Sequence, residues 1–270
     1  MALPMYFFSI NRVLLLSFLF LLNGCIQPVR TPIETIEYDA ENVNGPRMLF
    51  VFLPGRGDSV TVFQKEGLIK AVRERGLPVD VIAVNAHVGY YLNGTVFTRL
   101  REDVIKPSRS RAYNQIWLIG NSLGGYGSLT YAREHSDEIT GVVLLGPFLG
   151  SQSVIHDILE AGGLEKWKPG EIKLNTEEQW DNHLWMWVKD CLQQKRCFRN
   201  VYMGYGRDDR FSDAQALLAS SLPSDHVIVI EGGHNWRTWK KLWLMFLGEK
   251  IFTVRNVPGT APAGRNDPPR

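Results

Sequence analysis

The amino-acid sequence predicts an α/β fold, in which a mostly parallel central sheet carries helices on both faces. Continuous apolar runs, typical of strands buried on both faces, alternate along the chain with segments of helical periodicity. Several of these runs end directly in glycine-rich turns. This alternation indicates right-handed crossovers between neighbouring parallel strands. We expect strands at residues 35–40, 48–53, 79–84, 115–119, 141–145, 199–205 and 226–230.

The helices between these strands follow from their apolar spacing and their stop signals. A helix over 60–75 is stopped by Gly76 and Pro78, residues 85–94 form a loop, and a helix over 95–106 is closed by Pro107. Further helices are expected directly after Ser122, at 212–221 and at 236–247.

One insertion interrupts this rhythm. Residues 148–198 separate two expected strands and contain four of the eight tryptophans, namely Trp167, Trp180, Trp185 and Trp187. We expect a helix from about 177 to 194 within a tryptophan-rich helical cap over the sheet, whose aromatic side chains line an apolar pocket. The alternative is that the tryptophans simply pack this helix on the body.

Length and composition are those of an ordinary globular protein. The 270 residues suffice for one large α/β domain or two small ones, with 44% hydrophobic and 21% charged residues. The net charge of +2 is too mild to indicate nucleic-acid binding, and no basic stripe interleaved with aromatic residues occurs. We therefore expect no nucleic-acid partner.

The N-terminal residues have the features of an export signal. Residues 13–22 form an apolar run after Arg12, too short for a comfortable membrane span but suited to the core of a signal peptide. The run leads into Leu22-Asn23-Gly24-Cys25, which resembles the signal of bacterial lipoproteins. The resemblance implies a signal peptide at 1–24 and a mature protein in the bacterial cell envelope, facing the periplasm or in the outer membrane, held by acyl chains on Cys25. The alternatives are an uncleaved anchor helix and an ordinary secretory signal.

The remaining segments outside the regular alternation are short. Residues 25–34 contain Pro28 and Pro32 and are expected to form a tether to the membrane. Residues 255–270, with four prolines and two glycines, are expected to be disordered. Cys191 and Cys197 could form a disulfide in an oxidising periplasm, or could stay unpaired.

The segment 115–131 contains the motif on which the functional prediction depends. An apolar run ends in Gly120-Asn121-Ser122-Leu123-Gly124 and is followed by helical spacing, which gives the pattern G-x-S-x-G between a strand and a helix. A serine at the apex of such a turn has a strained backbone, and side chains at 120 or 124 would clash with neighbouring elements. The turn would expose the Ser122 hydroxyl above the sheet. The alternative is a plain turn with an inert serine.

Two more strand ends carry residues that would activate this serine. Ser122 needs a base with a pKa near 7, for which His234 is the candidate, and the imidazole needs a carboxylate on its other nitrogen. Asp208 and Asp209 compete for that role. No Cys/His cluster has metal-ligand spacing and no nucleotide-binding glycine motif occurs, so we expect neither a metal nor another cofactor.

The order Ser122, Asp209, His234 resembles that of the α/β-hydrolase family, and residues 232–236, GGHNW, look most like its esterase branch. The resemblance covers 48–247 and implies one α/β-hydrolase domain over 35–254 with a Ser-His-Asp triad. In the family the acid typically follows a strand-ending glycine by three residues, so Gly206 points to Asp209. The oxyanion would be bound by the amides of Leu123 and Arg56, the latter in a Pro-Gly-Arg-Gly loop where the family commonly has His-Gly.

The resulting expectation is a serine hydrolase that cleaves carboxylic esters through an acyl-enzyme, with a small-molecule ester or acyl compound as substrate. An acyltransferase or a thioesterase could use the same three residues. A non-catalytic binding module of the envelope is the alternative from another class, for which a missing triad residue would have been the sign.

Overall fold

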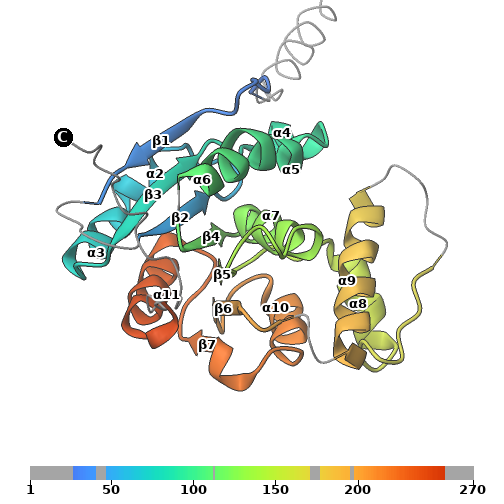
Figure 1. The fold of residues 1–270 in the computed structure, drawn as a ribbon. Coiled ribbons are helices and arrows are strands. Elements are labelled where there is room, and N and C mark those ends of the chain that lie inside the picture. The colour runs from blue at the N-terminus through green and yellow to red at the C-terminus, as the bar shows by residue number, and fades with distance from the viewer. Residues whose placement is uncertain (1–26, 41–46, 112, 171–176, 195–197, 253–270) are drawn as a thin grey trace, which may run out of the picture.

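The computed structural model describes residues 27–40, 47–111, 113–170, 177–194 and 198–252, and it has one seven-stranded sheet (Figure 1). The strand order is β1-β3-β2-β4-β5-β6-β7, with β1 antiparallel to β3 and all other pairs parallel. The predicted α/β architecture is therefore confirmed. The strands are β1 (Thr35–Tyr38), β2 (Met48–Leu53), β3 (Val79–Val84), β4 (Gln115–Asn121), β5 (Gly141–Leu145), β6 (Val201–Gly206) and β7 (Val227–Ile230).

Helices cover both faces of this sheet and bury two apolar clusters. Strand β2 shows why, because Leu49, Val51 and Leu53 join one cluster while Met48, Phe50 and Phe52 join the other. The second cluster also contains residues of α2 (Val62–Lys65), α3 (Leu68–Glu74) and α11 (Trp236–Gly248). The first contains residues of α4 (Val88–Leu92), α5 (Val96–Arg99), the π-helix η2 (Leu100–Ile105), α7 (Leu123–Glu134), α8 (Gln152–Glu160), α9 (Glu177–Gln194) and α10 (Ser212–Ala219). Short helices α6 (Lys106–Ser110), η3 (Ser224–His226) and η4 (Lys250–Phe252) complete the described elements.

The prediction was wrong for three helical segments between β2 and β4. The single helix expected over 60–75 is divided into α2 and α3 by Gly67, which has a left-handed φ of 81°. The loop expected over 85–94 contains α4. Pro107 does not end the next helix, because α6 follows directly on η2 with helical backbone and contains Pro107 as its second residue.

The described part of the insertion between β5 and β6 contains α8 and α9, which pack against each other (Figure 1). Trp185 is fully buried and donates from Nε1 to the carbonyl of Leu149 at 2.9 Å. Trp187 packs edge-on against Phe198, with ring centroids 5.3 Å apart. Of the aromatic residues expected to line a pocket, Phe148 does so, but Trp167, Trp185 and Trp187 do not. These three tryptophans belong to the apolar cluster on this face of the sheet or pack against it, which is the alternative that the sequence also allowed.

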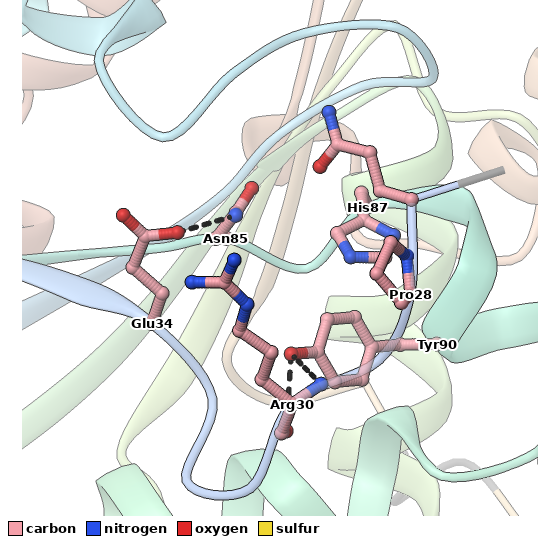
Figure 2. A pocket seen from close by; sticks show the side chains of 7 residues that line it. Pro28, Arg30, Glu34, Asn85, His87 and Tyr90 are labelled. Carbon is pink, nitrogen blue, oxygen red and sulfur yellow. Dashed lines mark hydrogen bonds between the residues drawn. The ribbon is translucent and has the colours of Figure 1, made fainter. Parts of the chain in front are cut away.

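Residues 27–34 lie against the body, although the sequence suggested a tether. The amide of Arg30 donates to the Tyr90 hydroxyl at 2.9 Å, and the hydroxyl donates to the carbonyl of Arg30 at 3.1 Å (Figure 2). Ile33 is buried, and its amide donates to Asp103 Oδ2 at 2.8 Å. This segment leads into the edge strand β1, so it continues the fold toward the N-terminus.

Several predictions concern residues outside the described ranges, including the signal peptide, Cys25, Cys197 and the tail 255–270. Cys191 is disulfide-bonded, and its pairing with Cys197 stays a prediction because residue 197 is not described. Among the described helices, none is both long and apolar enough to cross a membrane.

Candidate active site

The structure brings Ser122, His234 and Asp209 together above the carboxyl ends of β4, β6 and β7. His234 Nε2 lies 2.9 Å from Ser122 Oγ, and His234 Nδ1 lies 2.8 Å from Asp209 Oδ2 and 3.0 Å from Oδ1. Asp208, the competing acid, is exposed, and its amide donates to the carbonyl of Gly232 at 3.0 Å. The geometry therefore places Asp209, not Asp208, beside the imidazole.

The turn between β4 and α7 holds Ser122 in a backbone conformation that only close packing can maintain. Ser122 has φ 49° and ψ −117°, and no other non-glycine residue in the described part of the chain has a positive φ. A Cβ on Gly120 would collide with the carbonyl group of Gly124, and a Cβ on Gly124 would collide with the carbonyl of Leu53. Glycine at both positions lets α7 approach β2 and β4 closely enough to present the hydroxyl.

His234 is fixed by aromatic side chains as well as by Asp209. The rings of Phe211 and Trp239 stand perpendicular to the imidazole, each with its centroid 4.9 Å away. Only 8% of the His234 side chain and 0% of the Asp209 side chain are exposed. Asp209 Oδ1 also accepts from the amide of Phe211 at 2.9 Å, which helps to compensate the burial of its charge. The imidazole is thus held in one orientation.

The two amides predicted to bind an oxyanion lie at the start of α7 and in the loop after β2. Within the described residues, neither Leu123 nor Arg56 donates its amide hydrogen to another protein group. Both groups are therefore available to a substrate oxygen. At the N-terminus of α7 the positive end of the helix dipole adds to this attraction for negative charge.

Asp58 anchors the loop after β2, and our sequence analysis missed it. Its carboxylate accepts hydrogen bonds from Asn121 Nδ2 and Trp236 Nε1, each at 3.3 Å, and its amide donates to the carbonyl of Gly55 at 3.2 Å. Burial raises the pKa of Asp58, and the two side-chain hydrogen bonds oppose that rise. The contacts tie the loop to the residue before Ser122 and to the residue that begins α11.

A cavity of about 380 Å³ opens beside Ser122. Five aromatic side chains contribute to its wall, namely Tyr91, Phe97, Tyr126, Phe148 and Phe211. Burial, together with the nearby charge of Asp181, raises the pKa of Tyr126 to about 12, so this phenol is neutral at pH 7. The wall is therefore mainly apolar next to the nucleophile.

Three charged side chains also line this cavity. Arg56 and Arg210 are exposed, and the Arg210 guanidinium lies 4.8 Å from the centre of the Phe211 ring. Asp181, from α9, is buried and accepts from the amide of Ser151 at 2.7 Å. The insertion thus contributes Phe148, Ser151 and the carboxylate of Asp181 to the site, and none of its tryptophans with described side chains.

Comparison with known proteins assigns the chain to a family. Residues 102–245, which include Ser122, Asp209 and His234, match the family described as "Putative esterase". The chain belongs to this esterase family. This chain is 27% identical to an acetyl esterase from Caldicellulosiruptor saccharolyticus over 136 residues. The alignment covers 45% of this chain. The chain spans about half the length of this curated relative, with 49% covered.

Solved structures confirm that this esterase family member has the α/β-hydrolase fold. It resembles an S-formylglutathione hydrolase from Staphylococcus aureus, with a TM-score of 0.52 and 13% identity over 82% of this chain and 98% of the other. Est1E from Butyrivibrio proteoclasticus gives a TM-score of 0.55 and 13% identity over 81% and 93%. A ferulic acid esterase gives 0.53 and 16% identity over 76% and 84%. At these identities the likeness concerns the fold alone.

The family member holds no candidate metal site in its described ranges, where no group of three or more His, Cys, Asp or Glu side chains could bind an ion. The groups that the structure brings together at this site are Ser122, His234 and Asp209, with the amides of Leu123 and Arg56 nearby.

Proposed function

We propose that this protein is a serine esterase that hydrolyses carboxylic esters through an acyl-enzyme. The observation that carries the proposal is the continuous series of contacts from Ser122 Oγ through His234 to Asp209 beside an apolar cavity. Membership in the esterase family supports the same reaction class.

In the first half-reaction, Ser122 Oγ attacks the carbonyl carbon of the ester while His234 Nε2 takes the hydroxyl proton. Asp209 accepts a hydrogen bond from Nδ1 and stabilises the imidazolium. The amides of Leu123 and Arg56 bind the oxyanion of the tetrahedral intermediate. The C–O bond to the alcohol then breaks, and His234 gives its proton to the leaving oxygen.

In the second half-reaction, water attacks the acyl carbon and His234 takes its proton. The intermediate collapses to a carboxylic acid, and Ser122 recovers its proton from Nε2. An alcohol or amine in place of water would give acyl transfer by the same steps. Product analysis with and without an added acceptor separates the two reactions.

The aromatic cavity favours an ester with a small apolar acyl or aryl group. Its volume of about 380 Å³ suits a group of modest size. Acetyl and feruloyl groups, named for two of the proteins described above, are therefore useful test substrates. A panel of acetyl, butyryl, octanoyl and feruloyl esters would rank them by kcat/KM.

We also place the protein at the bacterial cell envelope, anchored by lipid on Cys25. The support is the signal-like sequence at residues 13–25. Mass spectrometry of the mature N-terminus tests the anchor, because a chain that retains Met1 or carries an unmodified cysteine contradicts it.

The test of the catalytic assignment is covalent labelling of the purified chain with a fluorophosphonate probe. We expect the parent to be labelled and Ser122→Ala and His234→Ala to lose the label. Ser151→Ala is the matched control, because Ser151 lines the same cavity without contacting His234. Labelling that survives in Ser122→Ala would refute the assignment of the nucleophile.

A further inference from the structure

The charge that a substrate meets at the catalytic cavity is positive. Arg56 and Arg210 both line the cavity beside Ser122, and both are exposed, so their guanidinium groups lie at its mouth. Asp181 is the third charged residue of the wall, but it is buried and its carboxylate accepts a hydrogen bond from the amide of Ser151. A solute that approaches the cavity therefore meets two accessible cations, whereas the carboxylate is covered.

No acidic side chain of the protein neutralises these two cations. In the part of the chain that the structure describes, no ion pair includes Arg56 or Arg210. Arg207, in the same loop as Arg210, differs, because its Nε lies 3.1 Å from Glu231 Oε1 and it does not line the cavity. Cations without a counter-ion at the mouth of a cavity attract an anionic ligand.

The guanidinium of Arg210 is held in a defined place by an aromatic ring. Its Cζ lies over the Phe211 ring, 4.8 Å from the ring centre. The Phe211 ring in turn stands perpendicular to the imidazole of His234, with the two centroids 4.9 Å apart. A guanidinium stacked in this way keeps the N–H groups at its edge free to bind a carboxylate or a phosphate through two hydrogen bonds.

The contact of Phe211 with both groups indicates which part of an ester the cation would bind. His234 Nε2 must come within hydrogen-bond reach of the leaving oxygen to protonate it, so the alcohol part of the ester lies next to the imidazole. Arg210 flanks that position through Phe211. Arg56 follows β2, on the other side of β4 in the sheet, and adds its positive charge to the same cavity.

We propose that this esterase selects esters whose alcohol part carries an anionic group, a carboxylate or a phosphate, which Arg210 binds and Arg56 attracts. The apolar acyl group then occupies the aromatic cavity beside Ser122. This inference rests on the proposed function and deepens it, because it names the charge of the substrate and the part of the substrate that carries it.

The test compares para-acetoxybenzoate with its methyl ester, two acetyl esters that differ in the negative charge of the alcohol part. Release of the phenol gives kcat/KM for each, and the anionic-to-neutral ratio is compared between the parent and each variant, which cancels the different reactivity of the two substrates. We expect Arg210→Gln to lower this ratio about tenfold, mainly through a higher KM for the anion, because a charge-assisted hydrogen bond is lost. Para-acetoxyphenyl phosphate, compared with the same neutral ester, tests a phosphate in place of the carboxylate, and a tenfold loss with either anion supports the proposal.

Further variants separate binding at the cavity from a general effect of charge. Arg210→Glu should lower the ratio further than Arg210→Gln, and Arg56→Gln should lower it by a smaller factor. Arg207→Gln is the matched control, because it removes a cation from the same loop outside the cavity, and it should leave the ratio unchanged.

Two results would overturn the inference while leaving the proposed function intact. One is an equal ratio in the parent and in Arg210→Gln with both anions, when the parent still reacts with the fluorophosphonate probe. The other is an equal loss in Arg207→Gln and Arg210→Gln. Failure of the folded parent to react with the probe would instead refute the proposed function itself.

Discussion

At the scale of single residues, the neighbouring acids Asp208 and Asp209 lie in opposite environments. Asp209 is buried against His234, whereas Asp208 is exposed. We expect Asp209→Asn to lower kcat by about 10³- to 10⁴-fold, because an amide cannot stabilise the imidazolium and favours the wrong tautomer. Asp208→Asn should leave kcat unchanged. Steady-state hydrolysis of an acetyl ester, with thermal melts to verify folding, checks both variants, and equal losses would contradict the assignment.

Glu138 is a second residue whose ionisation matters, here for stability. Its carboxylate contacts Arg101 Nε at 2.7 Å and the Tyr131 hydroxyl at 2.6 Å. The hydrogen bond from Arg101, followed by that from Tyr131, lowers the pKa of Glu138 from about 4.5 to about 2, against the opposing effect of burial. Because folding lowers this pKa, the stabilisation is complete above about pH 5 and is lost as the pH falls from 4.5 toward 2.

We therefore expect Glu138→Gln to reduce the free energy of unfolding by about 1–2 kcal/mol at pH 7. The difference between parent and variant should shrink as the pH falls toward 3. Urea unfolding of both proteins between pH 3 and 7 measures it, with Glu134→Gln, on the exposed surface of α7, as the control. A difference that does not change with pH would exclude the ionic explanation.

At the scale of elements, the β4–α7 turn depends on the close approach of α7 to the end of β2. A methyl group on residue 124 would overlap the carbonyl of Leu53. We expect Gly124→Ala to cost about 3 kcal/mol or more and to abolish labelling of Ser122. Gly170→Ala is the control, because a Cβ there meets nothing within 4 Å. Thermal unfolding of both variants measures the difference, and a stable, labelled Gly124→Ala would refute the packing argument.

The elements that the sequence could predict are those set by local patterns. Strands β2 to β6 are continuous apolar runs, and the residues brought together at the site each follow a strand directly, so local patterns were sufficient. Apolar spacing does not show whether a helix breaks at a glycine such as Gly67 or continues through a proline such as Pro107. The burial of Trp185 depends on its contact with Leu149, 36 residues away, and no local pattern reports that contact.

At the scale of the whole molecule, residues 27–34 belong to the folded body. The bonds between Arg30 and Tyr90 join residues 60 apart, so a proline-containing stretch looked like a tether when considered by itself. We expect a chain that begins at residue 35 to be about 2–4 kcal/mol less stable than one that begins at 27, because it loses the burial of Ile33 and three hydrogen bonds. Urea unfolding of the two chains compares them, and equal midpoints with equal slopes would show that the segment adds nothing.

The separation of the three site residues along the chain also has a practical consequence. His234 contacts Ser122 across 112 residues and Asp209 across 25, and each residue follows a different strand of one sheet. By the proposed mechanism, Ser122 is reactive only in molecules whose sheet is assembled from β4 to β7. The fluorophosphonate label then counts correctly folded copies directly in a crude lysate, so a library of variants can be sorted for folding yield before any of them is purified.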